Sequence, residues 1–293
     1  MSYKIKKVFL QRKAKAFKFL MDTFQLSISE AQKWIDKKRL YENKKLVIHK
    51  SKFIEGEIEV IVFTPTTRGL RPIFETKDFA VFDKPSGVLV HPTFYDSDYS
   101  LTHEIKYLYG KDANIVHRLD KETSGVIIAS KHKTAEKRLK NSFEKQKIKK
   151  GYLALVDGKI DTELFIDAPI YKAKEELEIR LKVIIDDRGK PSQTKIIPLK
   201  YFKNTDSTLV EAIPFTGRQH QIRVHLFHMK HKIIGDPLYG VKTKYVLKYL
   251  KKELQGSERI KATGARRMML HANWIEFKYD NCYKIYSKTN LCQ

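Results

Sequence analysis

The sequence predicts an α+β fold in which a mixed, mainly antiparallel sheet domain follows a small N-terminal α/β module. From Ile73 onward, strand-like runs such as FAVFDK and TLVEAIPF mix with helical stretches such as THEIKYLYG and KTAEKRLKNSFEKQ. Their order is irregular, whereas a purely parallel sheet requires strands and helices to alternate. Gly, Pro and polar residues cluster in TTRGLRP, residues 66–72, which is a predicted linker. We therefore expect domains at residues 1–65 and 73–293.

The N-terminal module is predicted to contain a helix that begins near Ser27. Ser27 precedes Glu30 by three positions, as in a capping box. Ile28, Ala31 and Ile35 follow at the spacing of one helix face. The short runs LVIH and EIEVIVF are predicted strands, separated by the turn-prone FIEGE.

The larger domain shows no internal repeat and no low-complexity tract. The apolar run VIIA within SGVIIASK is typical of a buried strand. The lysine-rich span 241–267 is predicted to form an exposed helix and loop.

Charge is the most informative bulk property. Lys and Arg number 58 against 34 Asp and Glu, which gives a formal net charge of +24. A surplus of this size favours a polyanionic partner, because each phosphate contact releases condensed counterions. Simple solubility and an anionic membrane surface are the alternatives, but a membrane-surface helix usually carries an aromatic-rich apolar face. We therefore expect a nucleic acid and no membrane.

Other bulk features exclude several classes of protein. No apolar run approaches the roughly 20 residues of a membrane span, and the lysine-rich start lacks the apolar segment of a secretory signal. The two cysteines, Cys282 and Cys292, have no CxxC spacing. A disulfide framework or a cysteine zinc site is therefore not expected, and a reducing cytoplasm fits best.

The segment IVHRLDKETSGVIIASK carries the clearest chemical signal. The polar block HRLD, residues 117–120, precedes the turn residues TSG, 123–125, and then the apolar strand. Asp120 is thus predicted on a loop before a buried strand, held by the core yet open to substrate. A carboxylate can attack a sugar carbon directly, and it needs a positive partner to stay ionised when desolvated. The alternative is that Asp120 caps a turn through its backbone neighbours.

The string HRLDxxTSG matches the signature of RluA-type RNA pseudouridine synthases. Further strings resemble that family in the expected order, from residue 73 to residue 280: KPSGVLVHP, KKGYLALVDG, GRQHQIRVHLFHMKHKIIGDPLYG and MLHANWIEF. In addition, LSISEAQKWIDKKRLYENKKLVIHKSKFIEGEIEV resembles the S4 RNA-binding module, with Asn43-Lys44 where that module usually has an Asn-Gly turn.

The resemblance implies a role for four residues. Asp120 would be the catalytic carboxylate, acting either on the sugar or as a base. Arg223 would pair with it, because a guanidinium is always charged and can hold a carboxylate bidentately. Tyr152 would stack on the flipped uracil, which contributes about 1–3 kcal/mol per base, and its phenol could relay a proton. Arg118 would fill the space that the flipped base leaves.

Three further residues of the signature have supporting roles. His117 is expected to support the loop or to pack beside it, and Leu119 belongs to the same string. Gly125 would allow a close backbone approach to the base or an unusual turn. The implied isomerisation has no redox step, so we expect no cofactor.

The histidines at 220, 225, 228 and 231 do not have a recognised zinc-ligand spacing, so we expect no metal. In the same region the family usually has Gly-His-Pro where this chain has Lys230-His231-Lys232.

We therefore expect an isomerase that acts on uridine in structured RNA. The S4-like start and the charge favour large-subunit ribosomal RNA, with transfer RNA as the alternative. A binding-only S4-type RNA protein would be expected to lack Asp120, Tyr152 or Arg223. A nuclease or a glycosidase would usually need additional carboxylates. No obligate protein partner is evident.

Overall fold

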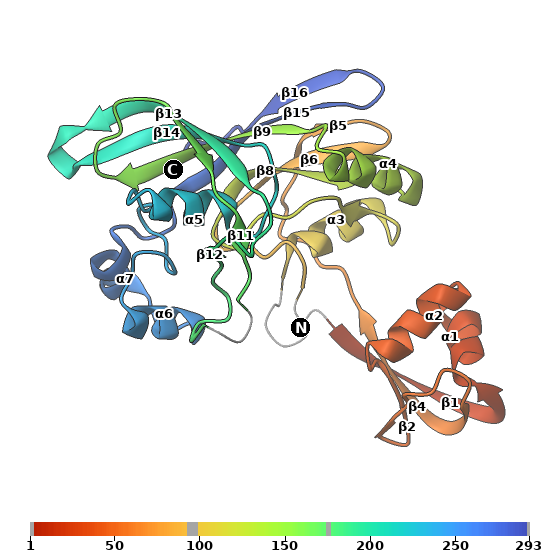
Figure 1. Cartoon of the computed structure of the whole chain (residues 1–293). Coiled ribbons are helices and arrows are strands. Elements are labelled where there is room, and N and C mark those ends of the chain that lie inside the picture. The colour runs from red at the N-terminus through yellow and green to blue at the C-terminus, as the bar shows by residue number, and fades with distance from the viewer. Residues whose placement is uncertain (1–2, 93–98, 174–176, 292–293) are drawn as a thin grey trace. The chain divides into compact units, whose positions relative to one another are not determined.

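The computed structural model describes residues 3–92, 99–173 and 177–291. These residues separate into two compact units. Residues up to Thr66, with Pro92 and Tyr99, belong to the first, and Thr67–His91 together with Ser100 onward form the second (Figure 1). The division falls at the edge of the segment 66–72 for which we predicted a linker.

The N-terminal unit packs two helices on a four-stranded antiparallel sheet of order β1-β4-β2-β3. Its core is a cluster of buried apolar side chains that includes Leu20, Ile35 and Ile58. The elements are β1 (Tyr3–Lys15), α1 (Ala16–Phe24), α2 (Ile28–Asp36), β2 (Leu40–Glu42), β3 (Lys45–Leu46) and β4 (Phe53–Phe63).

The predicted capping box at the start of α2 is confirmed. The Ser27 side chain accepts a hydrogen bond from the backbone N–H of Glu30, and the Ser27 N–H donates to the Glu30 carboxylate. Ala31 and Ile35 on this helix face are buried, whereas Ile28 at its start is 53% exposed. The buried stripe of this short helix begins only at its second turn.

The predicted strand boundaries in this unit were partly wrong. LVIH forms a strand only at its first residue, within β3. FIEGE is not a turn but the start of β4, because the unpredicted strand β1 pairs along it and places Leu10 opposite Gly56. The tight turn lies at Asn43-Lys44, where both residues have positive φ (46° and 64°), as a two-residue hairpin turn requires.

The second unit is built on a ten-stranded sheet with main path β10-β13-β14-β9-β15-β8-β6-β5, to which β16 and β7 add at β15 and β8. Among the strand pairs of the described residues, only β15 with β8 is parallel. This confirms the predicted mixed, mainly antiparallel class. The strands are β5 (Pro72–Glu75), β6 (Phe79–Lys84), β7 (Asn114–Ile115), β8 (Ser124–Ser130), β9 (Lys149–Asp157), β10 (Leu164–Asp167), β13 (Gln193–Phe202), β14 (Ser207–Pro214), β15 (Leu270–Lys278) and β16 (Cys282–Tyr286).

Helices flank this sheet in two groups (Figure 1): α3 and α4 lie near β6 to β8, and α5 to α7 lie beside the half that contains β13 and β14. The lysine-rich span 241–267 forms two helices, α6 and α7, where we expected one helix and a loop. No helix within the described ranges is both long and apolar enough to cross a membrane. The helices are α3 (Leu101–Tyr109), α4 (Lys133–Glu144), α5 (Gln221–His228), α6 (Thr243–Leu250) and α7 (Gly256–Thr263), and a small hairpin pairs β11 (Ile170–Tyr171) with β12 (Ile184–Ile185).

The sheet register places residues that are distant in the sequence side by side on neighbouring strands. Gly125 at the start of β8 pairs with Ala272 of β15, and Ala272 pairs on its other side with Tyr152 of β9. Gly125 has φ 105°, and a Cβ there would lie 2.2 Å from the carbonyl oxygen of Ala272. The glycine therefore permits close backbone approach to β15, and this contact fixes the loop before β8 beside Tyr152.

Candidate active site

The loop that carries Asp120 is fastened to the turn after β6. The backbone N–H of Gly87 donates to the carbonyl of Lys121 over 2.8 Å, and the Ser86 hydroxyl donates to the carbonyl of Glu122 over 2.7 Å. The buried ammonium of Lys84 donates to three carbonyls, including that of Lys121 at 3.1 Å. After this loop, β8 is buried at every residue. Asp120 thus lies on an irregular but firmly held segment.

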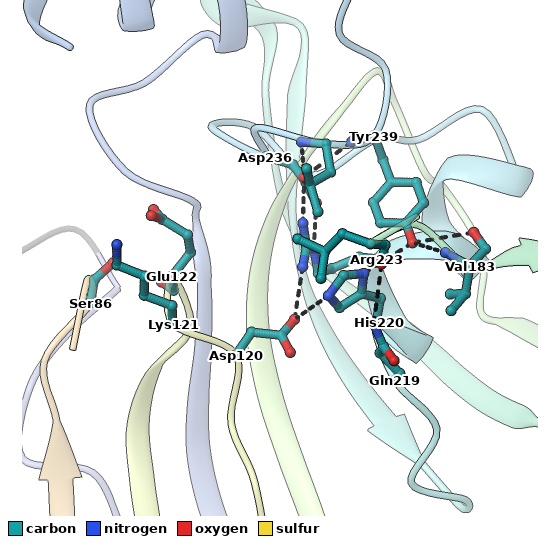
Figure 2. A network of polar contacts seen from close by, with 12 residues as sticks. Ser86, Asp120, Lys121, Glu122, Val183, Gln219, His220, Arg223, Asp236 and Tyr239 are labelled. Atoms are coloured by element: carbon teal, nitrogen blue, oxygen red, sulfur yellow. Dashed lines mark hydrogen bonds and ion pairs between the residues drawn. The ribbon is translucent and has the colours of Figure 1, made fainter. Parts of the chain in front are cut away.

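Asp120 is one end of a chain of three charged side chains (Figure 2). Arg223 on α5 donates from Nη1 to Oδ2 of Asp120 at 2.8 Å. The other edge of the guanidinium donates two parallel hydrogen bonds to Asp236, from Nε to Oδ2 at 2.7 Å and from Nη2 to Oδ1 at 2.8 Å. The expected bidentate hold on Asp120 was therefore wrong: the guanidinium fork binds Asp236, and Asp120 receives one bond.

Asp236 is itself rigidly placed, with a side chain only 1% exposed. Its Oδ1 also accepts backbone N–H bonds from Leu238 and Tyr239. Because Asp236 fixes the guanidinium plane, the remaining Nη1–H of Arg223 is aimed at Asp120 before any substrate binds. This arrangement is preorganised rather than adaptable.

The electrostatics of the site favour an ionised Asp120. Burial alone would raise the pKa of Asp120, but the charge of Arg223, with smaller contributions from His220 and Arg118, brings the pKa below its ordinary value. The Nε2 atom of His220 lies 3.7 Å from Oδ2 of Asp120. The aspartate is therefore a carboxylate at neutral pH, while its side chain remains 27% exposed and open to reaction.

Asp120 opens into a pocket of about 510 Å³ that Arg118, Tyr152 and Arg223 also line. Tyr152 is 9% exposed. Burial, reinforced by the charge of Asp120, raises the pKa of Tyr152, so its phenol stays protonated. Arg118 is exposed at this pocket, and within the described ranges of the chain no hydrogen bond or ion pair engages its guanidinium.

The remaining signature residues pack around the loop. His117 accepts a hydrogen bond from the backbone N–H of Ile128 at 3.0 Å and stacks on Phe143 with 4.5 Å between ring centroids. Burial lowers the pKa of His117 to about 3, so the ring is neutral. Leu119 is 8% exposed and belongs to the core.

Sequence reasoning missed two acidic residues of this site, Asp236 and Glu122. Glu122 follows Asp120 by two positions and accepts hydrogen bonds from Arg259 of α7 at 2.5 Å and Tyr249 of α6 at 3.2 Å. This ties the lysine-rich helix pair to the loop of Asp120. Both acids stand inside the quoted strings, but only the fold shows which cation each one meets.

Three of the four histidines considered as metal ligands have separate partners. His220 bonds the Tyr239 hydroxyl, His225 bonds Thr194 and the carbonyl of Ala168, and His231 bonds the carbonyl of Asp157. His228 is exposed at the end of α5. Across the described part of the chain, no three His, Cys, Asp or Glu side chains are grouped to hold a metal ion.

The free energy of unfolding should fall as the pH drops from about 6.5 towards 4. Burial, with a smaller contribution from the charge of Arg223, lowers the pKa of His220 to about 4. The pKa of a histidine in the unfolded chain is about 6.5. Between these values the unfolded state binds the extra proton, so stability rises with pH. His220 contributes up to about 1.4 kcal/mol per pH unit. Urea unfolding across this window should show a shallower slope for His220→Gln, and an equal slope would contradict the assignment.

The geometry offers an ionised, oriented carboxylate in a pocket wide enough for a nucleoside, with a protonated phenol beside it and cationic side chains around it. Such a carboxylate can act on a sugar carbon or remove a proton. The cations match a substrate that carries phosphates.

Comparison with known proteins gives a consistent result. Residues 78–228 match the family model described as RNA pseudouridylate synthase. The chain is 39% identical over 275 residues to an uncharacterized RNA pseudouridine synthase of Helicobacter pylori (strain J99), which covers 93% of this chain and 91% of that protein. It is 33% identical over 232 residues to ribosomal large subunit pseudouridine synthase D of Nitrosomonas europaea, 74% of this chain and 65% of that protein.

Among solved structures, human RNA Pseudouridylate Synthase Domain Containing 1 superimposes with a TM-score of 0.60 at 25% identity. The match covers 78% of this chain and 86% of the human chain. The family model, the relatives and the fold agree, and this chain belongs to the RNA pseudouridine synthases, isomerases that modify RNA.

Proposed function

We propose that this protein converts uridines to pseudouridine in large-subunit ribosomal RNA, with Asp120 as the catalytic carboxylate. The observation that carries the role of Asp120 is the fixed chain Asp120–Arg223–Asp236, in which one oxygen of Asp120 is bonded at 2.8 Å and the side chain stays 27% exposed. Arg223 keeps the carboxylate charged without closing it off from substrate.

The other pocket residues fit the remaining steps of this reaction. Tyr152 presents an aromatic ring, with its hydroxyl protonated, on which a flipped uracil can stack. Arg118 is exposed and available to occupy the space that the base leaves. His117, Leu119 and Gly125 serve this site by supporting the loop of Asp120, through the stacking, burial and backbone approach described above.

We further propose residues 1–65 as an S4-like RNA-binding domain and 73–293 as the catalytic domain of a cytoplasmic enzyme. In the N-terminal unit, the guanidinium of Arg39 lies over Tyr3 and Trp34, at 5.1 and 5.6 Å from the ring centroids. Lys37 and Lys38 are exposed beside it at the end of α2. A rigid arginine with neighbouring lysines suits an RNA backbone.

Ribosomal RNA is the substrate that two observations favour. The relative from Nitrosomonas europaea is named for the large ribosomal subunit. The net charge of +24 suits a large, densely charged RNA.

Mapping pseudouridine in cells with and without this gene tests the substrate. Carbodiimide-dependent stops in primer extension should disappear at discrete positions of large-subunit ribosomal RNA when the gene is deleted. They should return when the wild-type gene is restored. Loss of sites in transfer RNA alone would overturn the ribosomal assignment.

A further inference from the structure

Lys150 stands in the wall of the catalytic pocket, and no hydrogen bond or ion pair with another described residue engages its ammonium. It lines the pocket together with Tyr152, two positions along β9. Successive side chains of a strand point to opposite faces, so residues two apart share one face. Lys149, the neighbour on the other face, is exposed and forms an ion pair with Glu276 at 3.4 Å. Lys149 is therefore a paired surface cation, whereas Lys150 is a cation in the wall of the pocket.

Among the residues that the structure describes, none offers Lys150 a counter-charge. Its Nζ lies 6.0 Å from the ring centroid of Phe143 and 3.7 Å from where a side chain at Gly217 would begin. Its charge also reaches His117, whose pKa it helps to lower. Burial lowers the pKa of Lys150, and no carboxylate of the described residues offsets this.

A half-buried ammonium without a partner is costly for the free protein, because it has lost water and gained nothing in return. Asp120 does not compensate for it: burial lowers the pKa of Lys150 with no offsetting contribution from Asp120, and the main cations that act on Asp120 are Arg223, His220 and Arg118. A desolvated ammonium in a substrate pocket destabilises the free protein, and its presence is best explained by a negative charge on the ligand that pairs with it. Uracil and ribose are neutral, so the anion in an RNA strand is the phosphate.

We propose that Lys150 binds a backbone phosphate of the RNA strand that carries the target uridine and so positions the nucleotide over Asp120. This inference rests on the proposed function, because it needs an RNA strand in the pocket. A phosphate contact at this point carries no base specificity and sets the register of the strand.

The salt dependence of RNA binding tests the proposal. Binding of an unmodified large-subunit ribosomal RNA transcript is measured over a range of salt concentrations for the wild type, Lys150→Met, Lys150→Arg and Lys149→Met. The slope of log K against log salt should fall by about 1 for Lys150→Met. It should stay at the wild-type value for Lys150→Arg, which keeps the charge, and for Lys149→Met, which removes the same charge from the opposite face.

A stability measurement separates this role from a structural one. Removing an unpaired, half-buried charge should leave the urea midpoint of Lys150→Met equal to or above that of the wild type. A wild-type salt slope for Lys150→Met, or an equal fall for Lys149→Met, would overturn the proposal. So would a lowered urea midpoint with an unchanged slope.

The same series run with unmodified transfer RNA transcripts keeps the two hypotheses apart. If the wild type modifies only transfer RNA, the ribosomal assignment fails, and the slopes measured on transfer RNA still decide the role of Lys150.

Discussion

Asp120→Asn should reduce pseudouridine formation by roughly 10⁴-fold, the scale of losing a residue that takes part in the chemistry. Asparagine keeps the size of the side chain but has no negative charge, so it can neither add to a sugar carbon nor accept a proton. Arg223 keeps its two bonds to Asp236 in this variant, so the fold should persist. The measurement is single-turnover formation of pseudouridine on the RNA identified by mapping.

RNA binding by Asp120→Asn should stay within a few-fold of the wild type, because Asp120 offers no cation to a phosphate. Asp112→Asn is a matched control: Asp112 is an exposed acid in an ion pair with Lys133, and its loss should leave activity intact. Full activity of Asp120→Ala on a genuine substrate would remove Asp120 from its proposed role.

Asp236→Ala should lower the free energy of unfolding by about 3–5 kcal/mol, as expected when one partner of a buried ion pair is removed. Arg223 would then be a buried cation with one remaining bond, and the N–H groups of Leu238 and Tyr239 would lose their acceptor. Urea unfolding at neutral pH measures the loss. Activity should fall as well, because nothing would fix the guanidinium beside Asp120.

Asp280→Ala provides the comparison for stability. Asp280 also pairs with an arginine, Arg138, but this pair is exposed at the surface, so its removal should leave the free energy of unfolding almost unchanged. Asp236→Asn retains an acceptor for the two N–H groups and should be more stable than Asp236→Ala while still losing activity. An Asp236→Ala protein as stable as Asp280→Ala would contradict the buried network.

The helices and strands that could be predicted from the sequence are those whose signal is local. The capping box at Ser27 and the apolar strand of β8 follow from local chemistry and were confirmed. Strand β1 has little regular alternation of exposed and half-buried residues, so periodicity did not reveal it, and without it Gly56 was taken for a turn. Strand pairing is a long-range choice that local patterns do not contain.

In the candidate site, too, some contacts could be predicted from the sequence and others depend on the fold. A matched string placed Arg223 beside Asp120, and the distance between them is 2.8 Å. The string did not show that the fork of Arg223 binds Asp236, because this depends on how α5 meets the residues after it. Lys150 carried no signal among the 58 lysines and arginines, since what distinguishes it is burial without a counter-charge from the described residues.

The place of β15 in the sheet has a consequence for how the protein is made. This strand joins β8 to β9 and holds Gly125 level with Tyr152, yet it lies near the C-terminus, at Leu270–Lys278. The loop of Asp120 and Tyr152 both leave the ribosome before the strand that sets their register. A growing chain therefore cannot complete the pocket until this strand has left the ribosome, and the pocket can receive RNA only after that point.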